Sequence, residues 1–189
     1  MTDQKPADPR RLDVLAFARA QRSAQGRLLL DELPRLRDSV LPPAEGEAPP
    51  AFEWSVAGSF RQPVGREAQL RLHLRAGGVV RVTCQRCLEP LAVTLAVDNR
   101  LRFVEGEDEA QKLDELTDDE DVLALQPRLD LIELIEDELI LTLPLVPRHE
   151  RCRVTLPARA ADDGADDNPA PPAPSPFAAL ARLRGRAQD

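Results

Sequence analysis

The sequence has very few aromatic residues and almost no lysine. It contains no tyrosine and one tryptophan, and aromatic residues make up 3% of its 189 positions. Base stacking on aromatic side chains is the common way to read single-stranded RNA, so such an RNA-binding platform is not indicated. Only two of the 25 basic residues are lysines, Lys5 and Lys112. Together with its many alanines and prolines, this bias is typical of a GC-rich bacterial genome.

Long apolar runs and the common catalytic motifs are also missing. No apolar run approaches the length of a membrane span, and the first residues lack the apolar core of a signal peptide. The sequence has no P-loop, no dinucleotide-binding glycine pattern, no Gly-x-Ser-x-Gly and no His-Glu-x-x-His. We therefore expect a cytoplasmic protein that is not an enzyme and has neither a membrane partner nor a small-molecule substrate. In that compartment its cysteines stay reduced.

The negative charge of the chain is unevenly distributed. The net charge is −8, but residues 1–102 carry 16 basic and 12 acidic residues, whereas residues 103–189 carry 9 and 21. An acidic chain does not coat nucleic acid in general, because backbone affinity comes from neutralising phosphates. A locally basic face on the first half is compatible with this charge. The ten acidic residues of 105–121 predict a solvated, self-repelling loop, or else an arm that mimics phosphate and shields a basic partner.

Alternating patterns in the middle of the chain predict β-structure. Four stretches alternate apolar and polar residues with the period of a strand: residues 52–60, 70–75, 80–84 and 91–103. Gly77-Gly78 predicts a turn between the second and the third stretch. An antiparallel β-meander of about four strands accounts for this spacing. Asp8-Pro9 is typical of a helix start, and the apolar spacing that follows predicts an N-terminal helix to about Gln25.

The clearest helix begins near Asp130. Asp130 and Glu133 form a capping-box pattern, and apolar residues from Leu131 to Ile140 cover more than one face. This helix is expected to lie deep against the sheet. Its carboxylates are expected on the water-facing side, without a catalytic role: Glu133, Glu136, Asp137 and Glu138. The predicted fold class is therefore α+β, an antiparallel meander packed with a buried helix, in a single domain over residues 10–157.

The two ends of the chain differ from this domain. Residues 1–9 are expected to be disordered, and so is the Ala-, Asp- and Pro-rich linker 158–174. Residues 175–186 then predict a short C-terminal helix with Phe177, Leu180 and Leu183 on one stripe. A helix of this length is marginal alone, so it packs on its own domain or docks on a partner.

Four side chains with soft or borderline ligand atoms form two close pairs. Cys84 and Cys87 sit between two predicted strands, and His149 and Cys152 follow the buried helix. Three thiolates and an imidazole suit one structural zinc ion. Two alternatives remain: a reduced, metal-free pair that packs or faces RNA, and a redox dithiol, although the βαβ context of the latter is missing. The other histidine, His73, is expected as an exposed strand residue.

Several motifs, taken in order, resemble those of the YceD family. They are CQRCLEP from Cys84, DLIELIEDELIL from Asp130, and LPLVPRH from Leu143 with Cys152. PFAALARL from Pro176 is similar to that family's terminal Asn-Pro-Phe-x-x-Leu motif. The resemblance runs over roughly residues 10–185. It implies a role in 23S rRNA accumulation, hence in biogenesis of the large ribosomal subunit, and it implies no enzymatic activity.

These observations lead to one main functional prediction and two alternatives. The main prediction is a non-enzymatic ribosome biogenesis factor whose partner is large-subunit rRNA, a large-subunit ribosomal protein or a pre-ribosomal particle. The residues expected to approach RNA or this partner are arginines on or near the strands: Arg71, Arg75, Arg81, Arg86, Arg100 and Arg102. The alternatives are an acidic, chaperone-like module that binds a basic ribosomal protein, and a thiol-redox protein.

Overall fold

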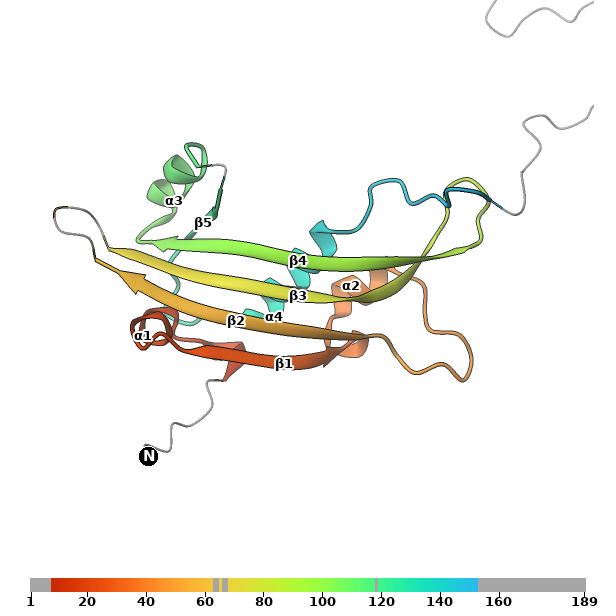
Figure 1. The fold of residues 1–189 in the computed structure, drawn as a ribbon, viewed down its shortest axis with the longest axis horizontal. Helices are drawn as coiled ribbons and strands as arrows, with labels where there is room; N and C mark the ends of the chain where they lie inside the picture. Colours follow the sequence, from red (N-terminus) through yellow and green to blue (C-terminus); the bar gives the residue numbers. More distant parts are fainter. Residues whose placement is uncertain (1–7, 63–64, 66–67, 118, 153–189) are drawn as a thin grey trace, which may run out of the picture. The chain divides into compact units, whose positions relative to one another are not determined.

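A five-stranded sheet forms the centre of the computed structural model, which describes residues 8–62, 65, 68–117 and 119–152. The strands follow one another across the sheet in chain order (Figure 1): β1 (Ser23–Leu29), β2 (Ala51–Arg61), β3 (Gln69–Thr83), β4 (Pro90–Val104) and β5 (Asp121–Ala124). The first four strands pair antiparallel, whereas β5 runs parallel to β4. The predicted antiparallel meander is confirmed, and β5 makes the sheet mixed.

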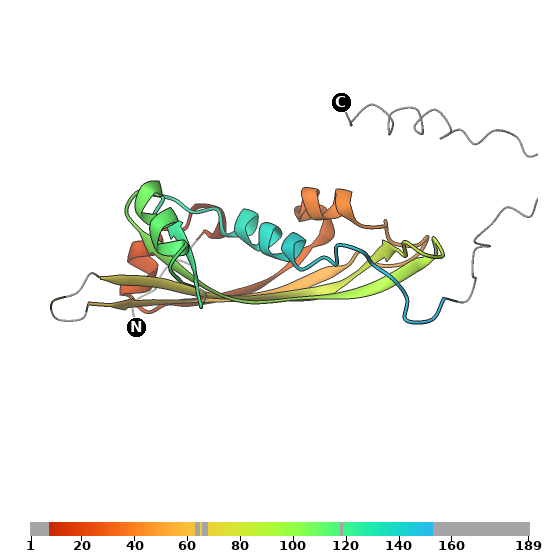
Figure 2. The ribbon, with the colours of Figure 1, turned by 90° about the horizontal axis from the view of Figure 1, so that it is seen from above.

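Helices cover one face of this sheet. They are α1 (Val14–Arg19), α2 (Pro34–Ser39), α3 (Glu107–Asp114) and α4 (Leu131–Leu141), with 3₁₀ turns at Pro9–Arg11 and Leu30–Glu32. Figure 2 shows α1, α2 and α4 on the same side of the strands, while α3 packs beside β5 at the β4 edge. α4 contacts β3 and β4, and its Ile135 and Leu139 are fully buried. The α+β class and the buried helix are confirmed.

The N-terminal helix is shorter than predicted. The Asp8 side chain accepts a hydrogen bond from the Arg10 N–H and starts only a 3₁₀ turn. Asp13 then caps α1 by accepting from the Ala16 N–H at 2.9 Å. The chain turns at Gln21, whose φ is +48°, so that β1 takes residues predicted to be helical. A second aspartate cap and an early turn thus divide the predicted helix.

The predicted turn at Gly77-Gly78 is wrong, because both glycines lie inside the continuous strand β3. A Cβ atom at Gly78 would lie 2.6 Å from the Phe52 ring and 2.8 Å from the Ala51 carbonyl oxygen. At Gly77 it would lie 3.0 Å from the Leu95 carbonyl oxygen. These glycines therefore let side chains and backbone of the neighbouring strands approach β3 closely. The actual hairpin between β3 and β4 lies at Cys84–Glu89.

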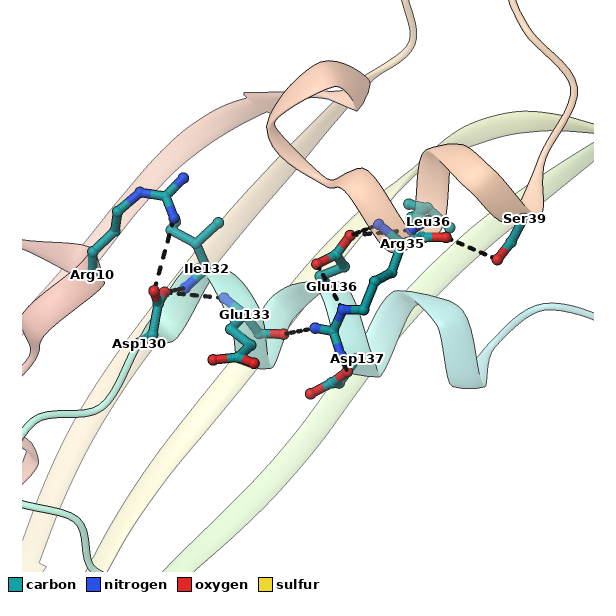
Figure 3. A network of polar contacts seen from close by, with 9 residues as sticks. All are labelled: Arg10, Arg35, Leu36, Ser39, Asp130, Ile132, Glu133, Glu136 and Asp137. Atoms are coloured by element: carbon teal, nitrogen blue, oxygen red, sulfur yellow. Dashed lines mark hydrogen bonds and ion pairs between the residues drawn. The ribbon is translucent and has the colours of Figure 1, made fainter.

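The carboxylates of α4 do not all face water, as Figure 3 shows. Glu136 is only 4% exposed, and its Oε1 accepts the backbone N–H groups of Arg35 and Leu36 at 2.6 and 3.1 Å. These groups open α2, whose own N-cap residue, Leu33, offers no capping side chain. The helix α4 thus supplies the cap that α2 lacks. Asp130 caps α4 itself, as predicted, by accepting from the Ile132 and Glu133 N–H groups.

The acidic stretch is more structured than the predicted solvated loop. Its first part forms α3, which begins after Gly106 with φ +87°. The Asp114 carboxylate accepts the Val122 N–H at 2.9 Å, and Glu120 binds the Arg71 guanidinium. The pairing of β5 with β4 and these hydrogen bonds offset the charge repulsion on which the loop prediction rests.

Several predicted segments lie wholly or mostly outside the described residues. They are the N-terminal segment 1–9 apart from Asp8 and Pro9, the linker 158–174, and the helix 175–186 with Phe177, Leu180 and Leu183. The domain limits 10–157 likewise stay predictions.

Candidate metal centre

The first cysteine pair sits in the tight turn that joins β3 to β4. Cys84 follows the last residue of β3, and its N–H donates to the Glu89 carbonyl at 3.0 Å. The Leu88 N–H donates to the Cys84 carbonyl at 2.9 Å, and Leu88 adopts a φ of +63°. The turn thereby holds Cys84 and Cys87 in a compact loop, and both are buried.

The second pair arrives on the loop that follows α4. The Gln85 N–H donates to the Pro147 carbonyl at 2.9 Å, which fixes this loop against the cysteine turn. The His149 N–H then donates to Cys84 Sγ at 3.4 Å. The sequence could not establish that two pairs separated by 61 residues meet. The structure brings all four side chains together.

The distances within this Cys–His cluster (Cys84, Cys87, His149 and Cys152) suit a tetrahedral metal ion. One ligand atom from each residue lies within 4.8 Å of the others. Cys84 Sγ and Cys152 Sγ are 3.8 Å apart, and Cys87 Sγ lies 3.4 Å from His149 Nδ1. Zinc–ligand bond lengths imply tetrahedral edges of about 3.8 Å between sulfurs and about 3.5 Å between sulfur and nitrogen. The donor set and its spacing therefore fit zinc.

Opposing effects act on the two buried thiols. Burial raises the pKa of Cys84, but N–H groups of His149, Arg86 and Cys87 point at its sulfur and lower the pKa to about 5. For Cys87 the Glu89 N–H lowers the pKa, but burial and the neighbouring sulfurs prevail and raise it. A metal ion that binds here meets one thiolate that is already formed, Cys84, and displaces the proton of the Cys87 thiol.

Arg86 completes the site in a way that the sequence analysis missed. Its Nε donates to Cys152 Sγ at 3.0 Å, and its Nη2 donates to the His149 carbonyl at 3.1 Å. The bond to Cys152 raises the pKa of Arg86. This guanidinium places a positive charge beside the sulfur atoms of the cluster and holds the later loop in place. Its position between the two cysteines was the available sequence signal.

The other predicted RNA-facing arginines lie on the strands, and most of them have partners. The contacts are Arg71 with Glu120, Arg75 with Asp98 at 3.1 Å, Arg81 with Glu47 at 3.1 Å, and Arg102 with Glu120 at 4.0 Å. Within the residues that the structure describes, the Arg100 side chain forms no hydrogen bond or close ion pair, although its charge helps to lower the pKa of Glu120. His73 lies on the same sheet face, half-buried, against Asp98.

The sequence that forms this site is similar to that of known proteins. A family model described as "Large ribosomal RNA subunit accumulation protein YceD" matches residues 72–184, which include all four residues of the Cys–His cluster. A relative of the same name from Haemophilus influenzae is 38% identical over 107 residues. This alignment covers 56% of the chain and 60% of the relative.

No solved structure matches the fold. Among the described residues, none of the helices is long and apolar enough to cross a membrane. With a family model that covers more than half of its residues, the chain belongs to the YceD family.

Proposed function

We propose that this protein is a non-enzymatic biogenesis factor that promotes accumulation of 23S rRNA and assembly of the large ribosomal subunit. The observation that carries the proposal is the family match across the cysteine turn, α4 and the following loop. The Haemophilus influenzae relative is itself named as a large ribosomal RNA subunit accumulation protein. Since ribosomes assemble in the bacterial cytoplasm, we place the protein there, with large-subunit rRNA, a large-subunit ribosomal protein or a pre-ribosomal particle as its partner.

The proposal includes one structural zinc ion held by Cys84, Cys87, His149 and Cys152. Four protein ligands complete a tetrahedron and leave no position for a reacting water, whereas catalytic zinc keeps one position open. Such an ion would tie the loop after α4 to the β3–β4 turn. This arrangement supports a role in recognition or assembly rather than in catalysis.

The acidic-module alternative has less support. Asp114 and Glu120 are engaged within the molecule, where they bind the Val122 N–H and the Arg71 guanidinium. Three other exposed carboxylates, Glu107, Asp108 and Glu109, occupy the first turn of α3, where negative charge suits the N-terminus of a helix. The thiol-redox alternative loses support for another reason: Cys84 and Cys87 are joined by a third cysteine and a histidine in one cluster.

The ratio of 23S to 16S rRNA tests the proposal. We would measure it in a strain that lacks the gene, with and without a plasmid copy. We expect the strain without the gene to lose 23S rRNA selectively. The wild-type copy should restore the ratio. An unchanged ratio would overturn the proposed function.

A further inference from the structure

One face of the sheet is left bare by the described elements. Side chains of β1–β4 alternate between the two faces, and α1, α2 and α4 cover only one of them (Figure 2). No helix among residues 8–62, 68–117 and 119–152 lies over the middle of the other face, which we call the open face. Uncharged side chains without large apolar groups are frequent on this face: Ser23, Gln25, Ser55, Ala57, Ser59 and Thr94.

Positive side chains gather at one end of the open face. Two arginines lie directly opposite each other on neighbouring strands, Arg71 and Arg102, and the adjacent cross-strand pair is His73 with Arg100. Like charges placed opposite each other destabilise a sheet, so folding alone does not favour this arrangement. One carboxylate, Glu120, contacts both Arg71 and Arg102, so these two arginines together keep a net positive charge.

The neighbouring positions extend this basic surface. Arg75 is 62% exposed, and its partner Asp98 is shared with His73. Arg61, on β2, and Arg100 are exposed, and neither forms an ion pair with another described residue. A cleft of about 470 Å³ at this end of the face is lined by Arg61, Arg71, His73 and Arg100, and also by the carboxylates Asp119 and Glu120. An anionic chain therefore finds several exposed donors in one place.

Phenylalanine, tyrosine and tryptophan are absent from the open face of β1–β4. The aromatic residues of these strands are Phe52, Trp54, Phe60 and Phe103, and by strand alternation all four belong to the helix-covered face. Proteins that bind single strands stack bases on aromatic rings, and among these rings the open face of β1–β4 offers only the half-buried His73. Duplex RNA offers phosphates and 2′-hydroxyls on its outside, and both are recognised without stacking.

We propose that the open face binds the sugar-phosphate backbone of double-helical RNA through Arg61, Arg75 and Arg100, with the Ser59 hydroxyl as a polar neighbour. The proposal rests on the proposed function, because that function supplies the RNA. The net charge of −8 does not prevent such binding. At physiological salt the Debye length is about 8 Å, so the charges near the contact determine RNA binding and the net charge of the chain does not. Binding without base contacts implies little dependence on sequence.

Fluorescence anisotropy with the full chain tests this inference, with a short labelled RNA duplex and its separate single strands as probes. The test variant is Arg75→Ala with Arg100→Ala. The matched control is Arg10→Ala with Arg37→Ala, which removes the same charge from exposed positions before β1 and on α2. Thermal unfolding of each variant verifies that it folds like the wild type.

The wild type should prefer the duplex, and its affinity should fall with salt. The test variant should lower the slope of log affinity against log salt by about 2, roughly one unit per lost phosphate contact. The control variant should keep the wild-type slope. Lysine at positions 75 and 100 should restore binding, because a phosphate accepts either cation.

Three outcomes would overturn the inference: preference for the single strands, equal slopes for test and control variants, and association only with a ribosomal protein after RNase treatment. The 23S to 16S ratio separates this failure from failure of the proposed function. If the wild type and the test variant restore the ratio equally and bind RNA equally, the open face is wrong and the function stands. If the wild type restores nothing, the function itself falls, whatever the binding data show.

Discussion

At the sulfur of Cys84, burial and hydrogen bonding act on the pKa in opposite directions. The donors prevail and place the pKa at about 5 instead of the ordinary 9.0. Because the folded-state pKa lies below the unfolded one, the thiolate stabilises the fold fully above pH 9. That contribution is lost as the pH falls from 9 towards 5. In metal-free protein, unfolding experiments between pH 5 and 8 should therefore show stability rising with pH.

The variant Cys84→Ala should lose this pH-dependent component, whereas Cys87→Ala should keep most of it, because the pKa of Cys87 is raised. Thiolate absorbance at neutral pH offers a second measurement, and it should fall in Cys84→Ala. Equal absorbance and equal pH dependence in the wild type and Cys84→Ala would show that the N–H donors do not stabilise a thiolate there.

Single residues also mark the limit of sequence reasoning. The ligand set Cys84, Cys87, His149 and Cys152 could be named from spacing and side-chain chemistry, and the structure brings these residues together. The role of Arg86 could not be assigned, because an arginine on a turn can donate hydrogen bonds to a sulfur or to an RNA phosphate equally well. Burial of Glu136 was also not predictable: a glutamate in a row of carboxylates gives no sign that another helix needs a cap.

For α2, stability depends on a carboxylate from another helix. Hydrogen bonds to a buried charged group contribute about 1.5–3 kcal/mol each. The variant Glu136→Gln keeps the shape but removes the charge at the α2 N-terminus (Figure 3). We expect it to lower the free energy of unfolding by about 2 kcal/mol, measured by urea denaturation.

The matched control for this cap is Glu133→Gln, one turn earlier on α4, where the side chain is exposed. Its effect should stay within about 0.5 kcal/mol, as for most surface substitutions. If the two variants were equally stable, the cap would contribute nothing and Glu136 would be an ordinary helix carboxylate.

In β3, the alternation of apolar residues predicts a strand, whereas the glycine pair predicts a turn that does not form. Gly77-Gly78 favours a two-residue hairpin turn by composition. Such a hairpin would place Leu74 opposite Arg81 and Val80 opposite Arg75, so each face would mix apolar and charged residues. In the continuous strand the even-numbered residues from Leu70 to Val82 share the covered face. The separation of apolar and charged residues thus favours a continuous strand over a turn at the glycine pair.

The parallel strand β5 and the helix α3 were not predictable from local patterns. The strand has only four residues, and the acidic composition around it favours a solvated loop. Its formation depends on the exposed edge of β4 and on partners from elsewhere, such as Asn99, which donates to the Asp121 carboxylate. Long-range pairing of this kind leaves no periodic signal in a short segment.

For the whole molecule, the Cys–His cluster links two parts of the chain that lie far apart in sequence. A metal there closes a loop that includes β4, α3, β5 and α4. An ion that binds only the folded state stabilises it by about 4 kcal/mol when its free concentration is a thousand times the dissociation constant. For a chain of this length we expect chelation to lower the unfolding temperature by about 10 °C.

The two histidines of the chain provide matched variants for this prediction. His149→Ala should abolish stoichiometric zinc, measured by elemental analysis, together with the response to chelator. His73→Ala, on the open face, should preserve both, because His73 is not part of the cluster. Protein that purifies without zinc, and whose unfolding temperature ignores both added zinc and chelator, would favour the metal-free alternative. In that case Arg86, the hydrogen bonds to Cys84 and the bond from the Gln85 N–H to the Pro147 carbonyl would hold the loop after α4 without a metal.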